Sequence, residues 1–316
     1  MAENGSGGAI VVTGAGGFIG RALVERLATR GARVTALLRR NVALPRSVEA
    51  RVLGNLNPGT DWPALLAEAR AVVHLASRAH VPASEEQHWI EAEAATAAAL
   101  ARAAAEAGVP RLVLMSSIKV LGDATPGRAF RADDAPVPGD VYGLAKWRIE
   151  VAMRAAAGER LAILRPPLVY GPGVKANFRA LLRLVDSGVP LPFARIDNRR
   201  SFIFLDNLLD LVETALVHPA AAGGIFLLRD DEDVSTAELA RRIARALGRR
   251  PRLFSCPPAL LGGLAALLGR RAAADRLLAS LRVDDLATRR QLAWQPRVGL
   301  DDGLAATCRV WRQERE

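Results

Sequence analysis

Apolar residues fall into short blocks along the first half of the chain, and longer mixed segments separate these blocks. Blocks of four to six residues that are rich in Val, Ile and Leu are typical of strands buried on both faces of a parallel sheet. Two of the mixed segments, residues 21–29 and 86–107, have helical composition and precede the glycines Gly31 and Gly108. The predicted strands are residues 9–13, 33–38, 71–75, 112–115 and 161–164.

The order of these elements predicts the fold class. Strands that alternate with helices indicate an α/β protein, here a Rossmann-type doubly wound parallel sheet with helices on both faces. The alternation loosens after about Gly171, where proline and arginine increase and helices dominate. We therefore expect residues 1–170 to form the sheet domain and residues 171–316 to form mainly a smaller C-terminal lobe, with some segments returning to the sheet.

One long apolar stretch, residues 258–268 (PALLGGLAALL), bears on the cellular setting. It is too short to cross a bilayer, and we interpret it as a buried helix. The first residues, MAENGSGG, are polar and lack the apolar region of a signal peptide. The two cysteines, Cys256 and Cys308, cannot form a disulfide framework. We therefore expect a cytoplasmic protein with no membrane partner.

Composition adds a net charge of +10, from 43 Lys and Arg against 33 Asp and Glu in 316 residues. A protein that binds nucleic acid gathers its cations on one element and interleaves aromatic residues among them. Here the arginines are spread along the whole chain and aromatics make up only 5% of it, so we expect no nucleic-acid partner. Arginine supplies 40 of the cations and lysine only three, at Lys119, Lys146 and Lys175.

The first predicted strand leads into a glycine-rich loop, TGAGGFIG, with Gly14, Gly17 and Gly20 at every third position. Glycines spaced in this way between a strand and a helix are a fingerprint of dinucleotide binding. The first permits a tight turn, the second lets the backbone approach a pyrophosphate at the helix N-terminus, and the third allows close packing of helix on strand. Phe18 and Ile19 belong to the same predicted cofactor contact.

The second predicted strand ends in Leu38-Arg39-Arg40 and carries no acidic residue there. At this place an Asp or Glu accepts a hydrogen bond from the ribose of NAD, whereas an Arg suits the 2′-phosphate of NADP. A guanidinium has no acceptor for a ribose hydroxyl. Arg39 therefore favours NADP over NAD, and the alternative is that both arginines are surface charges without a ligand.

Tyr142 and Lys146 are four residues apart, which places both on one face of a helix. Hydride transfer to or from a carbonyl needs a group that gives or takes the proton, and a nearby ammonium lowers the pKa of a phenol toward that task. Ser117, after the preceding predicted strand, can hydrogen-bond the same carbonyl oxygen. Both tyrosines and all three lysines lie within residues 119–175, which marks this stretch as the predicted reaction site.

Together these motifs resemble the extended short-chain dehydrogenase/reductase family, the NAD(P)-dependent nucleotide-sugar epimerases, dehydratases and reductases. The resemblance covers nearly the whole chain and includes VVHLAS at 72–77, LMSSIKVLG at 114–122, YGLAK at 142–146, LRPPLVYGPG at 164–173 and RSFIFLDNL at 200–208. The SSIKV, GPGVKANF and IDNRRSF stretches are most similar to a bacterial surface-polysaccharide branch of 4-epimerases and 4-keto reductases.

The resemblance implies roles for particular residues. Ser117, Tyr142 and Lys146 would form the catalytic triad, with Tyr142 as the proton carrier. The implied cofactor contacts add Asn55 and Leu56 at the adenine, Ala76 and Ser77 at the pyrophosphate and nicotinamide ribose, and Pro166. The implied substrate contacts are His80, Lys119, Asn177 and Arg200, the last two at the diphosphate of a nucleotide sugar. A structural role is the alternative for His80, and no metal site is expected.

The chain departs from the family pattern at two places. The helix before the catalytic Ser usually carries Asn-x-x-Gly-Thr, and here Ala92 and Ala95 replace the Asn and the Gly. The loss of the Asn removes a side chain that can serve a proton relay. Leu121 replaces a Tyr that is frequent in the SSxxVYG segment, which we interpret as a packing change.

We therefore expect an NAD(P)-dependent oxidoreductase that acts at C4 of a UDP-sugar. The favoured reaction is reduction of a UDP-4-keto-6-deoxy-N-acetylhexosamine, on the route to N-acetylquinovosamine, because Arg39 favours NADP and net reduction. The alternative is a UDP-glucose or UDP-N-acetylglucosamine 4-epimerase, which uses the same residues. A non-enzymatic dinucleotide-sensing protein on the same fold predicts a broken Tyr-x-x-x-Lys pair, and the pair is intact. By analogy with the family, we expect a homodimer.

Overall fold

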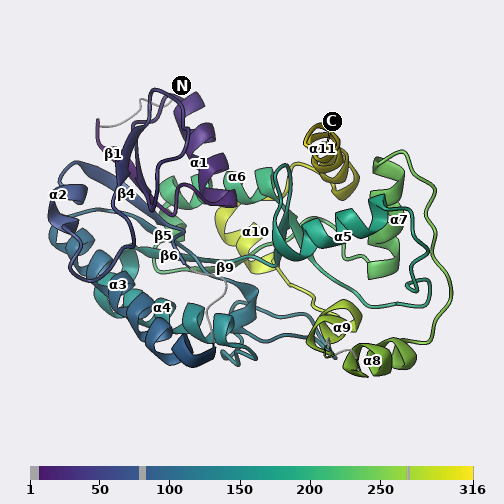
Figure 1. The fold of residues 1–316 in the computed structure, drawn as a ribbon. Coiled ribbons are helices and arrows are strands. Elements are labelled where there is room, and N and C mark those ends of the chain that lie inside the picture. The colour runs from purple at the N-terminus through teal and green to yellow at the C-terminus, as the bar shows by residue number, and fades with distance from the viewer. Residues whose placement is uncertain (1–6, 78–82, 268, 270, 316) are drawn as a thin grey trace.

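A computed structural model describes residues 7–77, 83–267, 269 and 271–315, and its main element is a seven-stranded sheet (Figure 1). The strand order is β3-β2-β1-β4-β5-β6-β9, and each neighbouring pair is parallel. This confirms the predicted doubly wound α/β fold. The strands are β1 (Ala9–Thr13), β2 (Val34–Leu38), β3 (Glu49–Val52), β4 (Ala69–His74), β5 (Leu112–Met115), β6 (Leu161–Arg165) and β9 (Ile225–Leu227).

The burial of each strand explains which ones the apolar pattern predicts. Every residue of β1, β2, β5 and β6 is buried, and these strands are the apolar blocks of the sequence. β3 lies at the edge of the sheet and is mostly exposed, so its sequence Glu-Ala-Arg-Val carries no apolar block. β9 has only three residues. The sequence pattern therefore missed β3 and β9.

Helices cover both faces of the sheet (Figure 1). Successive strand residues point to opposite faces, so Ile10 and Val12 of β1 join one core, whereas Val11 joins the other. The first core is covered by α1 (Phe18–Thr29), α6 (Leu205–Val217) and α10 (Leu286–Leu292). The second is covered by α2 (Trp62–Leu66), α3 (Glu86–Glu106) and α4 (Val141–Ala157).

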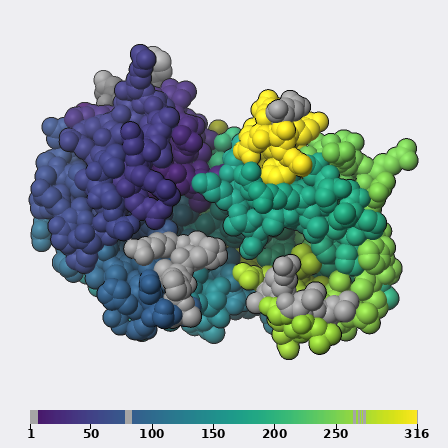
Figure 2. Space-filling view, viewed as in Figure 1, coloured from purple at the N-terminus to yellow at the C-terminus, as the bar shows by residue number. Residues whose placement is uncertain are grey.

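A separate core fills the C-terminal lobe, which lies beside the sheet and is divided from it by a hollow in the surface (Figure 2). Tyr170 stacks on Phe178 and tilts against Phe204, with ring centroids 5.3 and 5.5 Å apart. Around these rings lie α5 (Ala176–Asp186), α7 (Thr236–Ala246), α8 (Pro258–Leu267), α9 (Arg271–Leu278), α11 (Leu300–Gln313) and a two-stranded parallel sheet of β7 (Leu168–Tyr170) and β8 (Phe202–Phe204). Between these segments the chain returns to the large sheet as α6, β9 and α10.

The apolar stretch at residues 258–268 does form a helix, α8, but the expectation that it is buried is wrong. Leu260 is 58% exposed and Leu267 is 85% exposed. Leu261 packs against the C-terminal core, and Gly262 approaches Leu278 of α9. None of the helices in the described part of the chain combines the length and the apolar character that a bilayer crossing requires.

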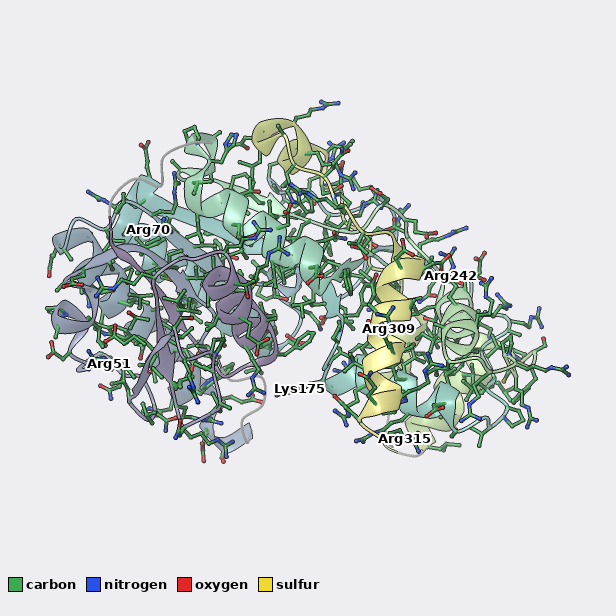
Figure 3. All side chains as sticks on the ribbon, turned by 90° about the horizontal axis from the view of Figure 1, so that it is seen from above. Arg51, Arg70, Lys175, Arg242, Arg309 and Arg315 are labelled. Carbon is green, nitrogen blue, oxygen red and sulfur yellow. The ribbon has the colours of Figure 1, made fainter. Side chains whose placement is uncertain are left out.

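The excess of arginine is distributed over the whole molecule rather than gathered on one element. Figure 3 shows Arg51 and Arg70 on the sheet domain and Arg242, Arg309 and Arg315 on the C-terminal lobe. Many arginines are paired, as in the contact of Arg242 with a Glu232 carboxylate oxygen at 2.6 Å. The net charge therefore does not by itself identify a binding face.

Candidate active site

The glycine loop lies between β1 and α1, and two of its glycines, Gly14 and Gly20, have no room for a side chain. Gly14 has a φ of +68°, and a Cβ there would lie 2.7 Å from the amide nitrogen of Ala76. A Cβ on Gly20 would overlap the carbonyl oxygen of Gly14, and one on Gly17 would lie 3.2 Å from the same oxygen. The loop therefore brings the start of α1 against the segment that follows β4, at the carboxyl edge of the sheet.

The residues around the loop can accept a dinucleotide. α1 begins after Gly17, so the amides of its first turn, including those of Phe18 and Ile19, have no side-chain cap, and its positive end faces the loop. The hydroxyl of Ser77 is buried and has no hydrogen-bond partner within the described residues. A cradle without side chains and an unpartnered hydroxyl both fit a bound pyrophosphate and ribose.

Thr13 and His74 support this cradle from below, and sequence reasoning assigned no role to either. The Thr13 hydroxyl accepts hydrogen bonds from the amides of Leu75 and Ala76, both at 3.2 Å, and lies 2.9 Å from Nδ1 of His74. Burial, with the charge of Lys146, lowers the pKa of His74 to about 3, so the imidazole is neutral. Their positions at the ends of the adjacent strands β1 and β4 were the available signal.

The predicted adenine-side residues lie at the carboxyl ends of β2 and β3. Arg39 is exposed directly after β2, and within the described residues it forms no hydrogen bond or ion pair. Asn55 is exposed after β3, whereas Leu56 is half-buried against the core. The amide of Leu53 donates to the Leu38 carbonyl at 2.9 Å, so these two strand ends are adjacent.

Ser117, Tyr142 and Lys146 come together beside the end of β5. Lys146 donates to the Met115 carbonyl at 3.0 Å, and its Nζ lies 5.8 Å from the centroid of the Tyr142 ring. The Tyr142 and Ser117 side chains share a hydrogen bond. Asp140 caps α4 by accepting the Gly143 amide at 2.8 Å, which fixes the first turn of the helix that carries both predicted catalytic residues.

The electrostatic setting of this group keeps the phenol protonated and the lysine close to losing its proton. Burial and the charge of Asp140 raise the pKa of Tyr142 to about 12, the hydrogen bond with Ser117 lowers it, and the charge of Glu93 raises it. Burial lowers the pKa of Lys146 to about 8, opposed by the charges of Glu93 and Glu150. The Tyr142 phenol is therefore a poor base until a further positive charge is placed beside it.

A buried ion pair fixes this group from behind, and sequence reasoning missed it. Arg165, at the end of β6, contacts both carboxylate oxygens of Glu150, with Nε at 2.9 Å and Nη2 at 2.6 Å. The Ser116 hydroxyl donates to the same carboxylate. Glu150 follows Lys146 by one helical turn, and this spacing was a signal in the sequence. Pro166, a predicted cofactor contact, follows β6, and its carbonyl accepts the Ile118 amide at 3.0 Å.

Three of the four predicted substrate-side residues belong to the described part of the chain. Lys119 forms ion pairs with Asp123 and, at 2.8 Å, with Asp140. Asn177 is exposed in the first turn of α5. Arg200 is half-buried, which lowers its pKa, and it donates to the carbonyl oxygens of Arg276 and Ala279 at 2.5 and 3.0 Å. His80 lies outside the described residues.

A groove of about 690 Å³ separates the glycine loop from the C-terminal lobe. It is lined by Gly17 and Phe18 on one side and by Lys175 and Arg179 on the other. Figure 3 shows Lys175 at the boundary between the two parts of the molecule. Neither Tyr142 nor Lys146 lines this groove.

Comparisons with known proteins identify a matching family and several similar enzymes. The model of the NAD dependent epimerase/dehydratase family matches residues 10–228. A UDP-glucose 4-epimerase of Vibrio cholerae is 37% identical over 313 residues, which cover 96% of this chain and 95% of that one. MoeE5, solved in complex with UDP-glucuronic acid and NAD, has a TM-score of 0.77 at 25% identity, with 97% of this chain and 100% of that one covered. UDP-N-acetylglucosamine 4-epimerase from Bacillus cereus has the same fold, with a TM-score of 0.78 at 20% identity over 97% and 100% of the two chains.

Proposed function

The chain belongs to the NAD dependent epimerase/dehydratase family, and from that premise we propose that it is a UDP-sugar 4-epimerase. The observation that carries the proposal is the intact group of Ser117, Tyr142 and Lys146. The 37% identity to a UDP-glucose 4-epimerase along nearly the whole chain favours epimerisation over the net reduction expected from Arg39.

In this proposal Tyr142 removes the proton of the sugar 4-hydroxyl and returns it after the carbon has changed configuration. Ser117 holds the phenol by its hydrogen bond and holds the sugar oxygen from the same side. Lys146, with its ammonium 5.8 Å from the ring, stabilises the phenolate. When bound, NAD would supply an acceptor for the C4 hydride that returns it to the opposite face of the sugar, and a positive ring that lowers the pKa of Tyr142 from about 12.

The proposed binding residues follow the two parts of the chain. Residues 1–170 would hold the cofactor through the glycine loop, Ser77 and Pro166, and residues 171–316 would mainly hold the UDP-sugar. Arg200 would reach the diphosphate by exchanging its backbone partners for phosphate oxygens. Cys256 and Cys308 are free thiols, which supports a cytoplasmic location. A homodimer remains our proposal from the family resemblance.

The decisive experiment supplies the purified protein with UDP-glucose or UDP-N-acetylglucosamine and NAD, and follows formation of the C4 epimer by chromatography. Epimer formation without net consumption of cofactor supports the proposal. NADPH consumption with UDP-4-keto-6-deoxy-N-acetylglucosamine, in the absence of any epimerisation, would replace it with the reductase.

The reductase is the second candidate because Arg39 is exposed and unpaired at the end of β2. If it binds the 2′-phosphate of NADP, Arg39→Ser weakens NADP binding and leaves NAD binding unchanged. Arg40→Ser is the matched control, since Arg40 is the exposed neighbour in the same turn. Equal effects of Arg39→Ser on both cofactors would exclude the 2′-phosphate contact.

A further inference from the structure

An apolar surface on the C-terminal lobe takes no part in the proposed reaction. Leu260 and Leu267 of α8 are 58% and 85% exposed, and Phe254, just before the helix, is 48% exposed. Single exposed apolar residues are ordinary on a protein surface. Two on a helix whose sequence is entirely apolar or glycine, and a third just before it, are not ordinary and indicate a contact surface.

The charge around this helix indicates what the surface contacts. Residues 251–274, which contain α8, include three arginines and no acidic residue. Arg252 before α8 and Arg271 after it are exposed. The first acid after this run, Asp275, lies 3.9 Å from Arg271 and is itself 65% exposed. Within the described residues Arg252 has no carboxylate partner, and Arg271 has only the exposed Asp275. An apolar helix flanked by such arginines matches a surface that is apolar inside and negative outside.

We propose that α8 rests on an anionic lipid bilayer and makes the protein a peripheral membrane protein. Phe254, Leu260 and Leu267 enter the interface, and Arg252 and Arg271 contact lipid phosphates. The ten-residue helix lies in the plane of the interface and does not cross it. Charge complementarity favours lipid over a second copy of this chain, which would bring the same arginines against each other.

α8 lies in the same lobe as Arg200, one of the predicted substrate contacts. α8 packs against α9 at one end of the C-terminal lobe, away from α11 and the sheet domain (Figures 1 and 2). Arg200 donates to the carbonyl oxygen of Arg276, a residue of α9. A bilayer under α8 therefore lies next to the lobe that carries the predicted diphosphate contact.

The test is sedimentation of the full chain with vesicles of phosphatidylcholine, with or without phosphatidylglycerol. We expect binding only to the anionic vesicles and a decrease with added salt. Leu260→Ser and Leu267→Ser should each reduce the partition coefficient about tenfold, and Arg252→Gln and Arg271→Gln about fivefold each. Val217→Ser is the matched control, since Val217 is 72% exposed on α6, outside this surface.

A second measurement keeps the proposal falsifiable if one variant folds poorly. Leu267→Trp should show a blue-shifted emission with anionic vesicles that brominated lipids quench, relative to the parent protein. The absence of vesicle binding, or equal binding by Leu267→Ser and the parent, overturns the proposal. So does a fall in oligomer mass for Leu260→Ser without any vesicle binding, because α8 would then be a contact between proteins.

Discussion

The two tyrosines of the chain lie near buried carboxylates that have different partners. Tyr142 is half-buried beside Lys146, and the carboxylate behind it, Glu150, is paired with Arg165. Tyr170 is fully buried and donates to Asp230 at 2.8 Å. Among the described residues the Asp230 carboxylate has only neutral donors, namely the Tyr170 hydroxyl, the Phe204 amide at 3.0 Å and the Asn207 amide group at 2.8 Å.

This difference shows how one residue type takes a chemical role in one region and a structural role in another. Tyr142 has a cation beside it and is open on one side, so its proton can leave when a further positive charge arrives. Tyr170 is committed as a donor, and burial and the charge of Asp230 raise its pKa far above the usual value. Rarity in the sequence drew attention to both tyrosines, but only their surroundings separate them.

The first prediction tests the chemical role of Tyr142. Tyr142→Phe should lower kcat for epimerisation by ~10²–10⁴-fold, because the ring remains and the proton carrier is lost. Binding of NAD, measured by calorimetry, should stay unchanged, as should the midpoint of urea unfolding. Retained turnover in Tyr142→Phe would remove Tyr142 from the reaction.

The second prediction concerns the ion pair behind Tyr142. Glu150→Gln leaves the Arg165 guanidinium buried without an opposite charge, so the free energy of unfolding should fall by ~3–5 kcal/mol. Urea denaturation followed by circular dichroism measures the change. The Ser116 hydroxyl also loses its carboxylate acceptor, and kcat should decrease because the segment before Ser117 is held by this contact.

A double variant provides the control for the ion pair. Glu150→Met combined with Arg165→Met removes both charges, and it should destabilise the protein less than Glu150→Gln alone. A loss below ~1 kcal/mol for Glu150→Gln would mean that water or another group neutralises Arg165.

The third prediction tests the structural tyrosine. Tyr170→Phe should lower the free energy of unfolding by ~1–3 kcal/mol, because one oxygen of the buried Asp230 carboxylate loses its donor. Turnover should remain near that of the parent protein, since Tyr170 lies in the core of the C-terminal lobe. The same chemical change at Tyr142 and Tyr170 thus separates a loss of rate from a loss of stability, and a large rate loss in Tyr170→Phe would contradict the assignment.

Much of the fold and part of the site could be predicted from sequence because their signals are local. Strands β1 and β5 are continuous apolar blocks, and the Tyr142–Lys146 spacing lies within one helical turn. The contact of Arg165 with Glu150 depends on β6 packing against α4, which no local pattern contains.

The exposure of α8 was not predictable for a similar reason. An entirely apolar helix has no polar face that would indicate which side meets solvent, so only the packing of the lobe reveals that Leu260 and Leu267 are uncovered.

The smallest expected effect separates Asp230, whose partners are neutral, from Glu150, which is paired with Arg165. Asp230→Asn should change the free energy of unfolding at pH 7 by less than ~1 kcal/mol, because an isosteric amide can keep the neutral partners and no cation is left unpaired. Burial raises the pKa of Asp230 above 3.8, so the native state penalises its charge. This penalty is absent below the unfolded-state pKa and grows as the pH rises through the window up to the raised native value. Unfolding measured from pH 3.5 to pH 7 should therefore show Asp230→Asn gaining stability relative to the parent with rising pH, and the opposite slope would mean that Asp230 has a cationic partner.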